Sequence, residues 1–271
     1  MIVAGISIAC TSTGTERKGS VPVGVSDTIA AKAPADKGKQ APAASMTSDR
    51  RAKAGTLNLA FVGDIMPGTT FPDSRLPEKD GATLFKDVDS ILVAADVAAG
   101  NMEGALADEG ETTKKGGKFS YSFRVPTRYG KLIADAGFDF MSMANNHAFD
   151  FGLDGVKSTE ATLHANGIAY SGIGGRRESA IVERNGIRYG FCAFGHNSYT
   201  LKHADLENVK RIIGNLREEA DIVIVSFHGG AEGTAHKHLP QGKEMFLGEN
   251  RGDLRNFAHF CIDNGADVVY G

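Results

Sequence analysis

Strand-like and helix-like runs alternate along residues 57–271, and four of the strand-like runs end in polar side chains. The strand-like runs are short apolar stretches, and the helix-like runs carry apolar residues on one face. This alternation is typical of a parallel sheet with helical crossovers. The carboxyl ends of parallel strands meet at one edge, so the groups that follow them can converge. These groups are Asp64, Glu103, Asn146 with His147, and His228.

The same pattern predicts the elements in order. Strands are expected at 57–62, 96–102, 138–143, 221–227 and 266–271, and a hairpin at 179–194 that turns on Asn185-Gly186. Helices are expected at 83–94, 126–136, 153–166, 206–220 and 253–264. The polar stretches 111–122 and 231–242 are expected to be surface loops.

The stretch 141–152, MSMANNHAFDFG, is the most distinctive part of the chain. An apolar run stops there on two carboxamides and an imidazole, Asn145-Asn146-His147. Asn is poor in strands and good in turns, so these side chains are expected at a strand's carboxyl end, where open α/β sheets bind ligands. From this stretch alone, a polar turn followed by a helix cap explains the pattern equally well. The tripeptide Asp150-Phe151-Gly152 also occurs in kinases, but no other kinase motif accompanies it.

Taken together, the polar strand ends indicate a metal site. Carboxylate, carboxamide oxygen and imidazole suit Mn, Fe or Zn. Singly, each group has an ordinary explanation: Asp64 could cap a helix, Glu103 could be a surface charge, and His228 could be a hydrogen-bonded core residue. Their shared position at strand ends favours convergence on a divalent metal.

Composition narrows the classes of protein. The 271 residues are 41% apolar and 23% charged, as in an ordinary globular protein, and the net charge of -3 gives no reason to expect nucleic acid as a partner. Three cysteines, Cys10, Cys192 and Cys261, are too few for a disulfide framework. Cys192 and Cys261 are interpreted as small buried apolar residues.

Residues 1–10, MIVAGISIAC, resemble the end of a bacterial lipoprotein signal. They are apolar and uncharged, and they lead through small residues to Cys10, the predicted lipidation site. They are too short to span a bilayer, which takes about 20 residues. Ser7 stands where such signals usually have Leu, and no basic stretch precedes the apolar run. We expect export to the outer face of the cytoplasmic membrane, with a lipid anchor at Cys10.

Residues 11–54 are expected to be a disordered tether, because they contain no aromatic residue and are rich in Ala, Lys, Thr, Ser, Gly and Pro. The tether has eight basic and four acidic residues, so the net charge of -3 leaves -7 on residues 55–271, the expected folded domain. The simplest interpretation is that the tether is a spacer whose mild basic excess has no function. The alternative is that the tether lies on an anionic membrane surface.

Residues 57–271 resemble the bacterial capsule-synthesis CapA family of the poly-γ-glutamate type, in the calcineurin-like metallophosphatase superfamily. The matching segments are FVGDIM (61–66), GNMEG (100–104), GFDFMSMANNHAFDFG (137–152), VSFHGGAEG (225–233) and GADVVYG (265–271). ANNHAFDFG is the most specific of them. The resemblance implies an α/β fold, a layered α/β/β/α sandwich of the metallophosphatase type, with a two-metal site along one edge.

The resemblance also implies a role for each polar strand end. The implied metal ligands are Asp64 for the first metal, Glu103 as the bridge, and Asn146 and His228 for the second. His147 is the implied general acid, and the supporting residues are Asn101 and Asn145.

Two departures from the family pattern affect the expected metal count. Met66 stands where the superfamily's Asp-x-His motif has its His, and no Gly-His-x-His motif follows GADVVYG. We therefore expect a sandwich truncated at its C-terminus. A catalytic metal needs at least three protein ligands and an open position. The 271-residue chain should then bind at most one Mn, Fe or Zn ion, weakly, and hydrolyse little. A full-length form that continues beyond Gly271 with a His-containing motif should bind metal more tightly, with up to two ions.

Three functions are open at this point. The first is an extracytoplasmic component of capsule or poly-γ-glutamate biosynthesis or export, with the anionic polymer and capsule-assembly membrane proteins as partners. The second is an active metal-dependent hydrolase of phosphoester or amide bonds, with His147 protonating the leaving group. The third is a non-catalytic module that binds an anionic polymer. A polyanion suits a domain of charge -7 only if metals or lysines, such as Lys114, Lys115 and Lys118, neutralise it.

Overall fold

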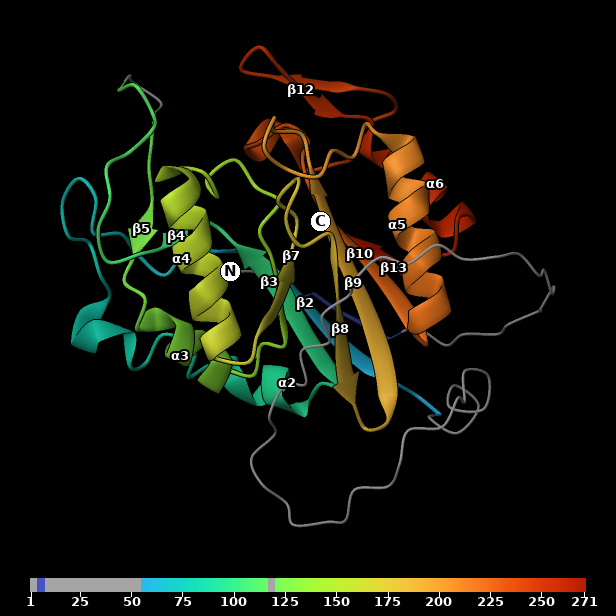
Figure 1. Ribbon diagram of the computed structural model, residues 1–271, viewed down its shortest axis with the longest axis horizontal. Helices are drawn as coiled ribbons and strands as arrows, with labels where there is room; N and C mark the ends of the chain where they lie inside the picture. The colour runs from blue at the N-terminus through green and yellow to red at the C-terminus, as the bar shows by residue number, and fades with distance from the viewer. Residues whose placement is uncertain (1–3, 8–54, 117–119) are drawn as a thin grey trace.

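A computed structural model describes residues 4–7, 55–116 and 120–271 (Figure 1). The predicted tether and the predicted lipidation site Cys10 lie outside the described residues. Strand β1 (Ala4–Ser7) pairs antiparallel with β2 (Asn58–Ile65), although the sequence led us to place residues 1–10 apart from the fold. The physical reason is that the outer edge of β2 carries unpaired backbone N–H and C=O groups, which a short extended segment can satisfy.

The architecture is the predicted α/β sandwich of two sheets. The first sheet has the strand order β1-β2-β3-β6-β7, and the second has the order β13-β10-β9-β8. The first contains β3 (Val97–Met102), β6 (Phe140–Ser142) and β7 (Ala169–Ser171), and the second contains β8 (Ser179–Arg184), β9 (Ile187–Gly195), β10 (Ile222–His228) and β13 (Val268–Tyr270). Strands β2, β3, β6 and β7 are parallel, and β10 is parallel to both of its neighbours. Their carboxyl ends can therefore supply one site.

The two sheets pack face to face through an apolar core. The rings of Phe140 and Phe191 stack across it with centroids 4.4 Å apart, and those of Phe61 and Tyr270 do the same at 4.4 Å. Continuous apolar strands suit this arrangement, because each central strand is covered on both faces. The packing holds the strand ends of one sheet beside those of the other.

Helices cover the outer face of each sheet (Figure 1). The first sheet carries α2 (Asp89–Ala94), α3 (Tyr129–Asp135) and α4 (Gly152–Ala165), and the second carries α5 (Leu206–Glu219) and α6 (Leu254–Asp263). Asp205 and Asp253 cap α5 and α6, since their side chains accept hydrogen bonds from backbone N–H groups of the first turn. Within the described ranges, no helix combines the length and the apolar character that crossing a membrane requires.

The predicted hairpin is confirmed, and the turn falls on the expected residues. Asn185 and Gly186 have φ angles of 52° and 75° between β8 and β9. Both values are positive, as a two-residue turn of the I′ type requires, and an Asn-Gly pair adopts them at low cost.

The helix expected at 83–94 begins only at Asp89. The segment before it contains a 3₁₀ turn, η1 (Glu78–Gly81), and further turns. Phe85 is buried edge-on against Phe138 with ring centroids 5.8 Å apart, whereas Leu84 and Ile91 are exposed. Phe85 and Leu92 therefore anchor this segment, with Val88 packed against the same core, and the apolar helix face that we inferred from the sequence forms only in part.

Several short elements were not predicted. They are β4 (Ala105–Leu106), β5 (Arg124–Val125), β7, the 3₁₀ turn η2 (Thr234–His236), β11 (Glu244–Phe246) and β12 (Glu249–Gly252). Strands β11 and β12 form an antiparallel hairpin that stands clear of the two sheets at one end of the molecule (Figure 1). This hairpin follows the loop after β10, the strand whose last residue, His228, was predicted to belong to the site.

Candidate metal centre

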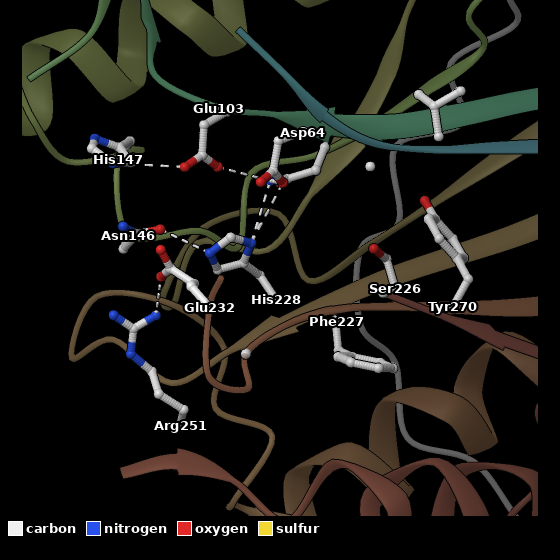
Figure 2. A pocket seen from close by; sticks show the side chains of 15 residues that line it. Asp64, Glu103, Asn146, His147, Ser226, Phe227, His228, Glu232, Arg251 and Tyr270 are labelled. Atoms are coloured by element: carbon white, nitrogen blue, oxygen red, sulfur yellow. Dashed lines mark hydrogen bonds and ion pairs between the residues drawn. The ribbon is translucent and has the colours of Figure 1, made fainter. Parts of the chain in front are cut away.

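A cleft of about 360 Å³ opens where strands of both sheets end (Figure 2). The predicted residues that line it are Asp64, Asn101, Glu103, Asn146, His147 and His228. The seventh, Asn145, is fully buried and is not among the lining residues. The sequence-predicted groups thus come together at one place, while the metal-binding and acid roles assigned to them stay predictions.

Asp64 lies near the end of β2, and Glu103 directly follows the neighbouring strand β3. The pairing runs from Phe61 opposite Ala99 to Asp64 opposite Asn101, so β2 contains one extra residue between these two pairs. Regular alternation would put Phe61 and Asp64 on opposite faces, but the bulge puts both on the face of Asn101. The Nδ2 of Asn101 then donates to Asp64 Oδ1 at 2.7 Å and to Glu103 Oε2 at 3.0 Å.

The buried side chain of Asn145 fixes the orientation of the Asn101 side-chain amide. Its Nδ2 donates to Asn101 Oδ1 at 3.0 Å and to the Met102 carbonyl at 2.8 Å. Its Oδ1 accepts from the backbone N–H of His147 at 3.0 Å. Because Asn101 Oδ1 is occupied as an acceptor, Nδ2 must face the carboxylates. Two buried amides therefore position the acidic pair and the turn that carries His147.

His228 is the last residue of β10 and presents its ring to the acidic pair. Its Nε2 lies 2.8 Å from Asn146 Oδ1, so Nε2–H donates to that oxygen. The Nδ1 lone pair then lies 3.5 Å from Asn101 Nδ2, with Asp64 Oδ1 at 3.7 Å. Burial lowers the pKa of His228, and the ring of His196 stacks on it at 6.3 Å. A neutral imidazole whose second nitrogen is held by a carboxamide is the form in which His binds metals.

The donor set fits a divalent cation. Ligand atoms of Asp64, Glu103 and His228 lie within 4.8 Å of one another, and within the described ranges no other group of three His, Cys, Asp or Glu side chains does so. Burial, followed by the charge of Asp64, raises the pKa of Glu103 to about 8. Two carboxylates held together by one amide thus lack compensating positive charge, which a cation would provide. Three protein ligands also leave a position open.

His147 faces the same centre from the turn before α4. Its Nδ1 lies 2.8 Å from Asp150 Oδ2, and its Nε2 points toward Glu103 Oε1 at 3.7 Å (Figure 2). The ring of Phe123 packs against it with centroids 4.4 Å apart. Asp150 holds the ring at Nδ1 and Nε2 faces the cleft, the arrangement that suits proton transfer there.

Two residues behind His147 were missed as parts of the site. Asp150 has a fully buried side chain that accepts from the Phe123 N–H at 2.8 Å and pairs with Lys114 Nζ at 2.6 Å. Lys114 Nζ also lies 3.1 Å from His147 Nδ1. The spacing of Asp150 three positions after His147, inside a turn, was a usable signal. No sequence pattern links Lys114, on a distant loop, to the same cluster.

The fold and the cleft together define a two-sheet α/β sandwich with a carboxylate–imidazole centre of the kind that binds divalent cations. More specifically, the chain belongs to the family described as bacterial capsule synthesis protein PGA_cap, whose model matches residues 58–271. The family predicted from the segments around Asp64, Glu103, His147 and His228 is thereby confirmed.

Relatives of the chain carry capsule-related names. It is 27% identical over 230 residues to the PGA biosynthesis protein CapA of Bacillus subtilis, covering 79% of this chain and 56% of the relative. It is 25% identical over 234 residues to the capsule biosynthesis protein CapA of Bacillus anthracis, covering 79% and 53%. The chain therefore spans about half the length of these curated relatives. A crystal structure of a hypothetical protein from Thermus thermophilus matches with a TM-score of 0.43 and 19% identity, covering 78% of this chain and 66% of that one.

Proposed function

We propose that this chain acts in the biosynthesis or export of a capsular poly-γ-glutamate, as an extracytoplasmic component whose cleft binds the anionic polymer around one divalent cation. The cation would be of the Mn, Fe or Zn type, held by Asp64, Glu103 and His228. The observation that carries the proposal is the convergence of these ligand atoms within 4.8 Å beside His147. Family membership and the names of the Bacillus relatives support the capsule context.

The residues of the cleft supply proton chemistry beside the cation site. Asp150 holds the His147 ring at Nδ1, so Nε2 is the atom that exchanges a proton with a bound polymer. The Lys114–Asp150 ion pair fixes the carboxylate that orients the ring. A divalent cation, when bound, supplies Lewis-acid polarisation of a carbonyl or phosphoryl oxygen. In hydrolysis of a polymer joined by amide bonds, water would attack the carbonyl carbon, the C–N bond would break, and His147, protonated at Nε2, would give its proton to the leaving nitrogen.

Active hydrolysis of the polymer, or of another amide or phosphoester, is the second candidate function. It is favoured by one specific observation, the direction of His147 Nε2 toward Glu103 and the cleft. A binding module would need no such oriented imidazole. We further propose that the lipid at Cys10 anchors the protein to the membrane, where membrane proteins of capsule assembly would be its partners.

The proposal is tested with the purified 271-residue chain, poly-γ-glutamate, and Mn²⁺ or Zn²⁺. Polymer binding is followed by isothermal titration with and without metal, and polymer length by size-exclusion chromatography over time. His147→Gln is compared with His164→Gln, which changes an exposed His on α4 away from the cleft.

We expect metal-dependent polymer binding by the wild type and by both variants. Shortening of the polymer by the wild type and by His164→Gln, but not by His147→Gln, would identify the hydrolase. Binding without shortening would restrict the role to biosynthesis or export without cleavage. Polymer binding that is absent, or that is indifferent to metal, would refute the proposal.

A further inference from the structure

The cleft has a second wall, formed by the loop after β10 and by the β11–β12 hairpin, and it carries one buried cation. Arg251, on β12, is buried, and it is the single Lys or Arg among the described residues that line the cleft. Its Nη1 donates to Glu232 Oε1 at 2.8 Å, and its Nε lies 2.9 Å from Glu249 Oε2. Its guanidinium also lies 5.4 Å from the ring centre of Phe246. An arginine held on several sides keeps its position when one partner leaves.

The two partners of this pair differ greatly in exposure. The side chain of Arg251 is 6% exposed, whereas that of Glu232 is 59% exposed. Gly230 and Gly233, which flank the loop segment of Glu232, both have positive φ angles. An exposed carboxylate on a loop loses little when it exchanges its partner for water, because a surface ion pair contributes only about 0–1 kcal/mol. A buried guanidinium that loses its carboxylate needs another anion.

Glu232 lines the cleft beside the candidate metal ligands. Figure 2 shows its carboxylate turned toward Arg251, on the side of the cleft where Asn146 lies. Burial is the main cause of the raised pKa of Glu103, but the charge of Glu232 contributes to it as well. A carboxylate of the chain itself thus holds the arginine in the same cleft as the candidate metal ligands.

We propose that Arg251 is the carboxylate-recognition residue of the cleft, and that Glu232 stands in its binding position until a carboxylate of an acidic polymer displaces it. This inference rests on the proposed function, because it names how the polymer is held at the same site. Arginine suits the task, since its planar fork binds carboxylates with paired hydrogen bonds. The displaced Glu232 turns to solvent, which also removes one negative charge from an acidic cleft.

The test measures binding of a short γ-linked glutamate oligomer to the full chain by isothermal titration in Mn²⁺. Glu232→Gln should bind the oligomer about fivefold more tightly, because the competing carboxylate is gone. Glu178→Gln is the matched control, since Glu178 pairs with Arg211 on the exposed surface at 2.7 Å, and it should change affinity less than about twofold. Arg251→Lys should weaken binding about tenfold, compared with Arg128→Lys at the surface pair with Asp80.

Weaker or unchanged oligomer binding by Glu232→Gln would overturn the inference, as would loss of Mn²⁺ affinity in that variant, which would make Glu232 a metal ligand. If Arg251→Lys unfolds, as its melting temperature would reveal, Glu232→Gln alone decides. Parallel titrations with α-linked polyaspartate and with polyphosphate separate this inference from the proposed function. If Glu232→Gln binds polyaspartate more tightly than the wild type does, and neither binds the γ-linked oligomer, the carboxylate site stands and the poly-γ-glutamate assignment is refuted. If Glu232→Gln binds only polyphosphate more tightly than the wild type does, the carboxylate assignment is overturned.

Discussion

The two walls of the cleft are built in different ways. The first-sheet wall, Asp64, Asn101, Glu103 and His147 with Asn145 buried behind them, is joined by amide hydrogen bonds of 2.7–3.0 Å. The hairpin wall, Glu232, Glu249 and Arg251, is a buried guanidinium with two exposed acids. The first can hold atoms at fixed positions, as metal ligation and proton transfer require, and the second can exchange its anion. Under the proposed function, chemistry belongs to the first-sheet wall and recognition to the hairpin wall.

The largest effect is expected when a ligand of the first-sheet wall is changed. Glu103→Gln removes a charged oxygen from the candidate metal centre and should weaken Mn²⁺ or Zn²⁺ binding by more than about 100-fold, since loss of an outer partner alone costs 10–100-fold. Asp154→Asn is the control, because the side chain of Asp154 is fully exposed on α4. Isothermal titration measures both. Equal affinity in the two variants would remove Glu103 from the ligand set.

A slightly smaller effect is expected from the amide beneath that wall. Asn145→Ala leaves the Met102 carbonyl and the His147 N–H without their partner in a buried place, which should cost about 2–3 kcal/mol of unfolding free energy. For a domain of this size the melting temperature should fall by about 5–10 °C. Asn256→Ala removes an exposed amide bonded to Asp253 and should have little effect. A cost of Asn145→Ala no larger than that of Asn256→Ala would mean that the wall is not rigid.

The protonation of Glu103 should make the free energy of unfolding depend on pH, with a change of about 2 kcal/mol. With the metal removed, the folded protein keeps a proton up to a pKa of about 8, while the unfolded chain releases it near 4.5. The folded state binds more protons in this window, so stability falls as pH rises, by up to about 1.4 kcal/mol per pH unit. The pKa of His228 is lowered from 6.5, so its opposite contribution is complete above that value.

Urea unfolding between pH 6.5 and 8, in the presence of a chelator, measures this slope. The wild type should lose stability across the range relative to Glu103→Gln, which has no carboxyl proton to release. Parallel curves for the two proteins would show that the carboxyl of Glu103 is already ionised at neutral pH.

The smallest effect is expected in the hairpin wall. Glu249→Gln removes one exposed partner of Arg251, and it should change the unfolding free energy by less than about 1 kcal/mol because the side chain is 52% exposed. Metal affinity should stay unchanged. A loss as large as that of Asn145→Ala would mean that both walls are equally rigid, and the division between chemistry and recognition would fail.

The first-sheet wall was largely predictable from sequence, and the hairpin wall was not. Asp64, Glu103 and His147 follow apolar runs of one parallel sheet, so the rule that parallel strands end at one edge was enough to bring them together. His228 ends a strand of the other sheet and joins them only through the packing of the two sheets. Arg251 lies in a segment without apolar alternation, and its hairpin turns on Leu247 and Gly248 with φ angles of 49° and 81°. A leucine with a positive φ angle is rare, so the sequence contained no pattern that predicts a turn at this position.

Contacts between loops that are far apart in the chain also could not be predicted from the sequence. The expectation of polar groups near the cleft included Lys114 as a charge that could neutralise a polymer, but its ion pair with Asp150 engages that charge behind His147. Asp150 was set aside with a kinase-like tripeptide, although its position after His147 fitted a local partner. Propensity and periodicity describe runs of residues, while such pairs depend on tertiary packing.

The extra residue of β2 determines which changes of chain length the acidic pair tolerates. Deleting Gly63, beside which no atom lies within 4 Å of an added Cβ, would straighten the strand. Phe61 would stay on the core face, and Asp64 would still lie opposite Asn101. Deleting Ala60 would instead reverse the faces of the residues before it. In a library of single-residue deletions across β2, functional survivors should therefore cluster at the bulge, making it the point where this strand can gain or lose a residue.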